Sequence, residues 1–229
     1  MLACCYNSVF PLSGVFMYLC PLCQQPLQLI ATQYQCPTRH SFDLAKEGYV
    51  NLLPVQQKKS KDPGDNQQMM QARRAFLQAG WYAPLAAQVV QMLKPFKIPR
   101  LLDLGCGEGY YSGMLQQHLS DTEQHGIDIS KVAIRYAAKH YPSIHFAVAS
   151  AYQLPFADHY FDAVVRIYAP SLASELTRVV QSSGYLLTVT PAPAHLVQIK
   201  QAIYPTVRLH SEEQAVLAGF KHIQRQQLS

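Results

Sequence analysis

The 229-residue sequence contains no long uninterrupted apolar run, and only 14% of its residues are charged. The absence of such a run excludes a membrane-spanning helix, which needs about 20 consecutive apolar residues. Residues 1–16 contain no Lys or Arg, and Pro11 interrupts their apolar stretch, so they make a poor signal peptide. We expect them to be an N-terminal extension without a fold of its own. An apolar content of 49% is ordinary for a globular chain.

Acidic residues are also few, with 14 Asp and Glu against 19 Lys and Arg, which leaves a net charge of +5. This mild basic excess allows an RNA partner but does not require one. The six cysteines are not distributed as in a disulfide-rich secreted protein. Three of them have metal-ligand spacing near the N-terminus, and Cys106 lies between two glycines. We therefore expect a reducing, cytoplasmic location.

The first chemical pattern is Cys20-Pro-Leu-Cys23, followed by Cys36-Pro-Thr-Arg-His40. Each pair can supply two ligands from one tight turn, and the four together suit tetrahedral zinc. The segment is short and has few apolar residues to bury, so it needs a metal to fold. We predict a structural zinc-binding module over residues 17–53, with no coordination position left open for catalysis. Free thiols in a surface loop are the alternative.

A glycine-rich turn organises the rest of the chain. A short apolar run predicts a buried strand, which leads into the motif Asp-x-Gly-x-Gly-x-Gly from Asp103 to Gly109 and then into an amphipathic helix. A second strand over residues 124–129 contains Asp128, which is placed to accept hydrogen bonds from ribose hydroxyls. Strand, glycine turn and helix in this order predict a doubly wound, Rossmann-like α/β domain.

The spacing of the glycines separates two nucleotide cofactors. The dinucleotide fingerprint requires glycine or alanine at position 110, where this chain has Tyr110. The observed form resembles motif I of class I S-adenosylmethionine-dependent methyltransferases, whose cofactor has no pyrophosphate. Asp103 and the correctly spaced Asp128 support this interpretation. A glycine-rich turn without a ligand is the alternative.

The segment before the glycine strand is polar and basic. Residues 56–65 contain three lysines among turn-forming residues, and the helix expected after them carries Arg73 and Arg74. These cations, close to a metal-bound module, would suit RNA phosphates. A solvated linker and helix face are the alternative. A second helix, expected over residues 84–93, leads to the glycine strand.

Helices and strands continue to alternate after the second strand. We expect helices over residues 131–140 and 171–180, the latter stopped by Ser183-Gly184, and strands over residues 144–148, 161–167 and 185–190. Ligands bind at the carboxyl ends of such strands. Arg166 and Tyr168, at the end of the fourth strand, are therefore expected to line the reaction site.

Several stretches carry a resemblance to one family: CPLC, CPTRH, FDLAKEGYVNLLPVQ, DPGDNQQMMQARRAFL, LDLGCGEGYY, DISKVAI, RIYAP and TPAPAHL. They are similar to the bacterial 23S rRNA (guanine-N1)-methyltransferases, from about Met17 to Phe220. The resemblance implies structural zinc on the four metal ligands above, S-adenosylmethionine as methyl donor and a hairpin loop of 23S rRNA as substrate. It also implies that the following residues contact the cofactor: Tyr82, Asp103, Gly105, Gly107, Glu108, Gly109, Asp128 and His195.

The chain then divides into four parts: an extension (1–16), the zinc-binding module (17–53), a basic loop with linking helices (54–99) and the methyltransferase domain (100–229). Metal binding and folding of the module are expected to be one event. A chelator should melt the module and leave the methyltransferase domain, which has a core of its own, largely folded.

The expected reaction places demands on the substrate. Guanine N1 lies on the Watson–Crick edge, so the base must be unpaired or turned out of its stack. Arg166 is the candidate to stabilise negative charge on guanine O6, with a structural hydrogen-bond donor as its alternative role. Tyr168 is the candidate to stack on the guanine ring.

Family members continue past Phe220 with the last antiparallel strands of the sheet, so this chain resembles a C-terminally shortened member. A non-catalytic relative that binds zinc and RNA is therefore the alternative function. A small-molecule methyltransferase is disfavoured, because its substrate helices would replace the zinc module. The sequence leaves the target guanine and the oligomeric state open, a homodimer included.

Overall fold

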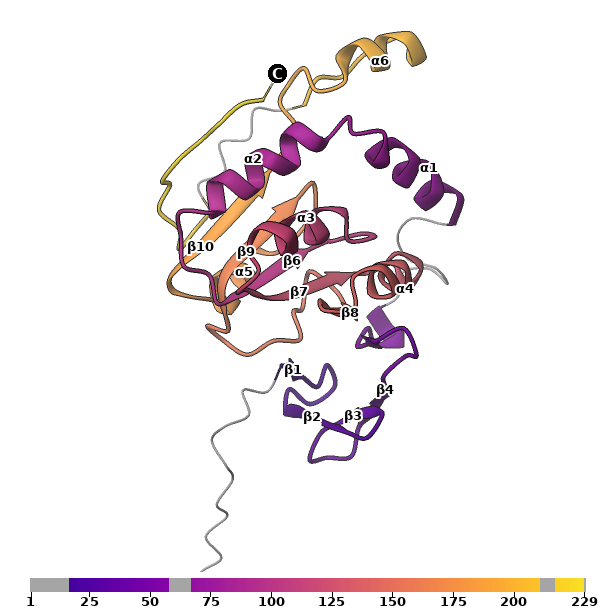
Figure 1. The fold of residues 1–229 in the computed structure, drawn as a ribbon, viewed down its shortest axis with the longest axis vertical. Helices are drawn as coiled ribbons and strands as arrows, with labels where there is room; N and C mark the ends of the chain where they lie inside the picture. The colour runs from indigo at the N-terminus through magenta and orange to yellow at the C-terminus, as the bar shows by residue number, and fades with distance from the viewer. Residues whose placement is uncertain (1–16, 58–66, 211–216, 229) are drawn as a thin grey trace, which may run out of the picture.

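The computed structural model describes residues 17–57, 67–210 and 217–228, and Figure 1 shows them as an α/β body with a small β unit beside it. The expected extension over residues 1–16 and the three lysines of the basic segment lie outside the described residues. No helix within the described ranges is long and apolar enough to cross a membrane.

The main sheet of the described chain is parallel, with the strand order β10-β9-β6-β7-β8-β5 (Figure 1). Its strands are β5 (Tyr49–Asn51), β6 (Arg100–Leu104), β7 (Glu123–Asp128), β8 (His145–Val148), β9 (Phe161–Ile167) and β10 (Val180–Val189). The chain proceeds outward from β6 to β8 and then returns to β9 on the other side of β6. This doubly wound order is the expected one, and it opens a crevice at the carboxyl ends of β6 and β9.

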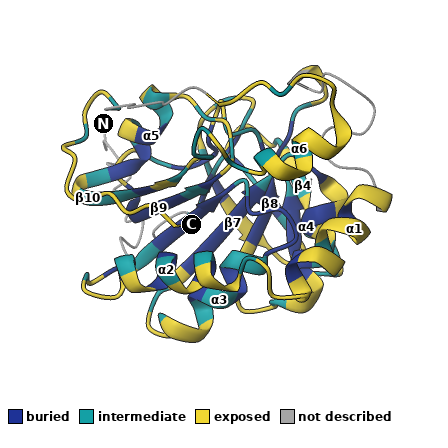
Figure 2. Ribbon diagram, turned by 90° about the horizontal axis from the view of Figure 1, so that it is seen from above, coloured by how far each residue is buried: buried dark blue, intermediate teal, exposed yellow. Residues whose placement is uncertain are grey.

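Helices flank the sheet. They are the 3-10 helix η1 (Val55–Gln57) and the α-helices α1 (Gln67–Gln78), α2 (Ala83–Leu93), α3 (Tyr110–His118), α4 (Lys131–His140), α5 (Ala173–Val179) and α6 (Val197–Ile203). Helix α4 has the predicted bounds, because the Ser130 hydroxyl caps it by accepting the N–H of Ala133 at 3.3 Å. Figure 2 shows burial concentrated in the sheet and α6 exposed along its length.

The two faces of the sheet bury alternate residues of each strand. Along β6, Leu102 and Leu104 belong to a core that includes Leu176 of α5. Leu101 belongs instead to the core that includes Val89 of α2. Side chains of a strand alternate between its faces, so this pattern sends Asp103 to the same face as Leu101.

A four-stranded antiparallel sheet forms the zinc unit, which we define as residues 17–44. Its strands are β1 (Tyr18–Leu19), β2 (Pro26–Ile30), β3 (Gln33–Gln35) and β4 (Ser41–Asp43), paired in chain order. The sequence assigns residues 49–51 to the same module. In the structure these residues are β5, which pairs in parallel with β8 at the edge of the main sheet.

The zinc unit and the main sheet share one core. Tyr18 is 1% exposed, its ring centroid lies 5.4 Å from that of Phe156, and the Leu19 N–H donates to the Pro155 carbonyl at 2.9 Å. The connection 149–160, described throughout, contains no helix. Parallel strands are usually joined through a crossover helix that covers the sheet. Here the zinc unit provides that cover, so one core of the main sheet includes zinc-unit residues, whereas the core that includes Val89 of α2 contains none. The separate core expected from the sequence therefore holds for one face of the sheet and not for the other.

The boundary between α5 and β10 also differs from the prediction. The helix ends at Val179, and β10 begins at once with Val180, which pairs with Phe161. The register shifts before Tyr185, and Ser183 has a left-handed φ of 68°. Ser183-Gly184 therefore belongs to a bulge within β10 rather than to the end of a helix. The reason is that Val180, which comes before these two residues, is already buried in the sheet.

Candidate functional site

Four ligand atoms converge in the zinc unit. The side chains of Cys20, Cys23, Cys36 and His40 offer ligand atoms that all lie within 4.8 Å of one another. The Sγ atoms of Cys23 and Cys36 are 3.6 Å apart, and the Nδ1 of His40 lies 3.5 Å from the Sγ of Cys20. Tetrahedral zinc, with Zn–S of about 2.3 Å and Zn–N of about 2.0 Å, separates its ligands by about 3.5–3.8 Å. The predicted set therefore fits zinc and leaves no open position.

Two tight turns present these ligands. The Gln24 N–H donates to the Cys20 carbonyl at 2.8 Å, and the Arg39 N–H donates to the Cys36 carbonyl at 2.9 Å. Gln24 and Arg39 adopt left-handed φ values of 59° and 66°. Each turn thus reverses the chain within a few residues, so that its two ligands face the same point.

Thr38 adds a contact that the ligand spacing does not reveal. Its hydroxyl lies 3.1 Å from the Sγ of Cys23 and 3.0 Å from the Sγ of Cys36. The hydrogen bond lowers the pKa of the Cys23 thiol to about 6, whereas burial raises the pKa of Cys20 to about 11. Because metals bind the thiolate, Thr38 favours the ligating form of Cys23.

The glycine loop joins β6 to α3. Gly105, Gly107 and Gly109 all have positive φ values, of 75°, 56° and 83°. A Cβ on Gly105 would collide with the side chain of Ala169 at the end of β9, and one on Gly109 would lie 3.0 Å from the Tyr141 ring. The loop therefore needs glycine both for its conformation and for space.

Asp128 fastens this loop from the end of β7. One carboxylate oxygen accepts the Gly107 N–H at 3.0 Å, and the other accepts the Ser130 N–H at 2.8 Å. The carboxylate is thus held beside the glycine loop, at the strand end where a ribose acceptor is expected.

Asp103 lies beneath the loop. It is 2% exposed and accepts a hydrogen bond from the Ser112 hydroxyl of α3 at 2.6 Å. Burial raises the pKa of its carboxyl group to about 6. Asp103 therefore ties β6 to α3 and supports the loop from within, because strand alternation turns it toward the face that α3 covers.

Three aromatic residues from distant segments meet above the strand ends. The Tyr82 hydroxyl lies 3.4 Å from the Nε2 of His195. The ring of Tyr168 stacks on that of His195 with centroids 5.6 Å apart and lies 6.4 Å from that of Tyr82. Burial lowers the pKa of His195, which favours the neutral imidazole. The structure thus brings together three residues predicted for this site.

A cavity of about 410 Å³ opens at the carboxyl ends of β9 and β10, lined by Arg166 and by residues 168–171 and 189–191. Arg166 donates from Nη1 to the Ser171 hydroxyl at 2.7 Å. Tyr168 has a left-handed φ of 53°. Ala169 is part of the same wall and lies directly against Gly105. The cavity therefore adjoins the glycine loop.

Comparison with known proteins identifies both parts of the chain. The zinc-ribbon family described as "RlmA, N-terminal" matches residues 18–61, and the family described as "Methyltransferase domain" matches residues 101–187. The 23S rRNA (guanine(748)-N(1))-methyltransferase of Streptomyces fradiae is 34% identical over 206 residues, which cover 87% of this chain and 72% of that protein. The chain belongs to the 23S rRNA (guanine-N1)-methyltransferase family.

Other members of this family align over a similar span. A Bacillus subtilis protein named for the same activity is 31% identical over 198 residues, covering 82% of this chain and 69% of that protein. One named likewise from Micromonospora griseorubida is 33% identical over 201 residues, covering 79% and 67%. The fold is that of class I S-adenosylmethionine-dependent methyltransferases, and the two sites fit S-adenosylmethionine and zinc. Tyr82 and His195 lie outside both matched segments, so the contact between their side chains is known from the structure and not from the family matches.

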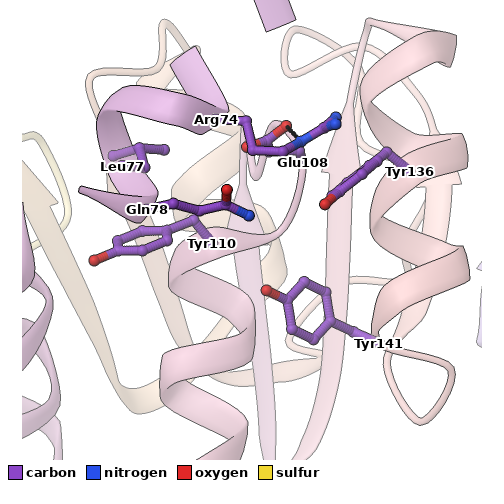
Figure 3. Close-up of a pocket in the computed structure, with 7 residues that line it drawn as sticks. All are labelled: Arg74, Leu77, Gln78, Glu108, Tyr110, Tyr136 and Tyr141. Carbon is purple, nitrogen blue, oxygen red and sulfur yellow. Dashed lines mark hydrogen bonds and ion pairs between the residues drawn. The ribbon is translucent and has the colours of Figure 1, made fainter. Parts of the chain in front are cut away.

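Figure 3 shows an ion pair that the sequence did not predict. Arg74 of α1 lies between Glu108 of the glycine loop and Tyr136 of α4. Its Nε is 3.0 Å from a carboxylate oxygen of Glu108, and its Cζ is 3.4 Å from the centroid of the Tyr136 ring. The Glu108 side chain is only 5% exposed. Helix α1 is thereby fastened across the loop.

This arrangement gives Arg74 a partner within the protein. The sequence offered Arg74 as a candidate phosphate ligand, with a solvated helix face as the alternative, and the family resemblance implied Glu108 as a cofactor contact; in the structure the two side chains pair with each other. Both are among the residues that line a cavity of only about 40 Å³. Because Arg74 and Glu108 are 34 residues apart, no local sequence pattern predicts that they pair.

Proposed function

We propose that this protein transfers a methyl group from S-adenosylmethionine to N1 of a guanine in a hairpin loop of 23S rRNA. The observation that carries the proposal is similarity to enzymes named for this activity across 79–87% of the chain. That similarity is accompanied by the zinc-ribbon and methyltransferase matches together. The non-catalytic alternative is not favoured, and we expect the protein to act in the cytoplasm, with its RNA substrate.

The cavity supports a base as the acceptor. Guanine N1 carries a proton and lies on the pairing edge, so the base must be unpaired or turned out of its stack before the methyl group can reach it. A cavity of about 410 Å³ is large enough to hold one base, and its wall adjoins the glycine loop through Ala169. A base in this cavity would lie next to the cofactor region.

The chain offers contacts for each part of the cofactor. When bound, S-adenosylmethionine supplies a methyl group activated by its sulfonium charge. We infer that Asp128 accepts the ribose hydroxyls, as its position beside Gly107 suggests. The open backbone of the glycine loop admits the ligand closely. Tyr82 and His195, whose hydroxyl and Nε2 atoms lie 3.4 Å apart, are proposed to cover the bound cofactor.

Catalysis by this site would consist mainly of alignment. Arg166 is proposed to stabilise negative charge on guanine O6, with its bond to Ser171 holding the guanidinium at the cavity wall. The alternative role, a structural donor, rests on the same bond. Tyr168, exposed at the rim, is proposed to stack on the guanine ring. The zinc ion is proposed to be structural, since its four protein ligands leave no position for substrate.

The test is methylation of RNA by the purified protein. The protein, S-adenosylmethionine and a 23S rRNA hairpin are incubated, and the RNA is read by reverse transcription, which an N1-methyl group arrests because it blocks pairing. We expect arrest at one guanine, and none with Asp128→Ala. RNA binding without methylation would support the non-catalytic alternative, and transfer only to small molecules would refute the proposal.

A further inference from the structure

Exposed aromatic side chains gather where α1 turns into α2. Trp81 is 71% exposed and Phe76 is 43% exposed. Between them, Gly80 takes a φ of 82° in open space and bends the chain between the two helices. Aromatic side chains of this size normally gain from burial, so an exposed pair at one corner indicates a surface that another molecule covers.

This surface leads into the cavity through a series of ring contacts. The centroid of Phe76 lies 5.4 Å from that of Tyr82, and Tyr82 lies 6.4 Å from Tyr168. Tyr168 lines the cavity and is itself 43% exposed. Aromatic rings therefore continue from the proposed base-binding cavity to the outer corner of α1.

Helix α1 also carries positive charge that reaches the glycine loop. Arg73 is exposed and precedes Phe76 by three residues, and its Nη1 lies 3.9 Å from the place that a Cβ on Gly107 would take. Its neighbour Arg74 binds Glu108 and Tyr136 and anchors the helix (Figure 3). Exposed rings together with a guanidinium on the way to the glycine loop suit single-stranded nucleic acid, with bases on the rings and a phosphate on the cation.

We propose that Arg73, Phe76 and Trp81 bind unpaired nucleotides that adjoin the target guanine in the RNA loop. This inference rests on the proposed function. A base can enter the cavity only while attached to its strand, so the neighbouring nucleotides must cross the rim of the cavity. Phe76 is connected to Tyr168 in the cavity wall through the ring of Tyr82, and the exposed rings of Phe76 and Trp81 provide stacking surfaces for unpaired bases. The occupant is therefore single-stranded RNA rather than a second protein.

The chain allows a direct measurement, because Trp81 is its only tryptophan. The emission of Trp81 is recorded while the full-length protein is titrated with a 23S rRNA hairpin that has an unpaired loop. The control RNA has the same stem closed into a continuous duplex. We expect quenching by the hairpin and not by the duplex. Unchanged emission on a hairpin that is demonstrably bound would overturn the inference.

Substitutions provide the second arm. Trp81→Ala is expected to weaken hairpin binding about tenfold, whereas Trp81→Phe, which keeps a ring, should retain most of the affinity. Phe76→Ala should act like Trp81→Ala, but the ring contact with Tyr82 makes Trp81→Ala the deciding variant. The matched control is Tyr152→Ala, because Tyr152 is also an exposed aromatic residue (50%) but lies in the connection after β8. Binding of S-adenosylhomocysteine should be unchanged in the two Trp81 variants and in Tyr152→Ala.

Methyl transfer separates this inference from the proposed function. Trp81→Ala should raise the KM for the hairpin and leave kcat nearly unchanged, because the substitution removes contacts outside the cavity. Wild-type kinetics and affinity in this variant would overturn the inference alone. Quenching that depends on protein concentration without RNA would assign the surface to self-association and also overturn it. A wild-type protein that neither binds nor methylates RNA would overturn the proposed function with it.

Discussion

At the scale of single residues, the glycine loop depends on positions that carry no side chain. Gly105 combines a φ of 75° with direct contact to Ala169, so a methyl group there meets two separate obstacles. Gly48 offers a comparison, because its φ is 91° but a Cβ would meet nothing within 4 Å. The two positions therefore separate backbone strain from steric collision.

Gly105→Ala should be the more damaging of the two substitutions. Gly48→Ala is expected to cost about 1–2 kcal/mol of unfolding free energy from left-handed strain alone. Gly105→Ala should cost about 1–3 kcal/mol more, because the core beside it is already filled. Urea denaturation measures both. Adding Ala169→Gly should recover much of the excess, and equal losses at the two glycines would contradict the collision.

Asp103 gives the stability a distinct pH dependence. Burial raises its pKa in the folded state to about 6, above the unfolded value of about 3.9. The folded state therefore holds this proton more tightly, so stability from this group falls as pH rises from about 4 to 6 and is lost above that range. As the pH rises across this window, the unfolding free energy of Asp103→Asn should increase relative to that of the wild type by up to about 3 kcal/mol. Chemical denaturation of both proteins at several pH values tests this, and a pH-independent difference would exclude Asp103.

At the scale of elements, α1 is held to the glycine loop by one shielded ion pair. Arg74→Ala would leave Glu108 without that partner in a largely buried position, and we expect a loss of about 1–3 kcal/mol of unfolding free energy. Adding Glu108→Gln should restore part of it, since no buried charge then remains. The control is Arg135→Ala, whose side chain is 61% exposed beside Glu47 and should matter little. Urea denaturation that ranks Arg135→Ala as equally costly would contradict the shielded pair.

Most elements could be predicted because their signals are local. Helix α4 has a clear apolar period and Ser130 as its cap, and β9 is a mainly apolar run, interrupted by Asp162 and Arg166, with the predicted bounds. The start of β10 was predicted wrongly, because Ser183-Gly184 is typical of a helix end and also suits a bulge. Only the pairing of Val180 with Phe161 decides between the two.

The same distinction applies to the site. The four metal ligands and the glycines follow fixed spacings, so the sequence predicts them residue by residue. Asp128 follows from its place at a strand end. Arg74 with Glu108, and Thr38 with its two thiolates, could not be predicted, because such contacts depend on how turns and helices are packed in space.

At the scale of the whole molecule, the zinc unit and the sheet are not separable. Tyr18 packs on Phe156, and the Leu19 N–H donates to the Pro155 carbonyl at 2.9 Å, so one face of the main sheet depends on the zinc unit for cover. The sequence predicts that a chelator melts the zinc-binding module alone. The shared core leads us to expect a different result.

Metal removal should lower the stability of the entire protein. With a chelator, thermal unfolding is expected to remain a single transition at a lower temperature, and amide exchange should accelerate in β8 as well as in the zinc unit. Cys36→Ser should reproduce this state and make the protein insensitive to the chelator. Two separate transitions, with exchange in β8 unchanged, would instead support independent units.

The position of β5 also has a consequence for the order of events during synthesis. The metal ligands are complete once His40 has been made, and their turns close locally, whereas β5, apart from its contacts with the neighbouring residues 44 and 45, pairs in the main sheet only after β8 follows. Long-range pairing of this kind is slow and leaves strand edges exposed in the meantime. Refolding from denaturant should accordingly be slower without zinc, which stopped-flow fluorescence can measure. The metal would keep the first part of the chain folded while most of the sheet is still being made, and one edge of the sheet would then close on a part of the chain that was made first.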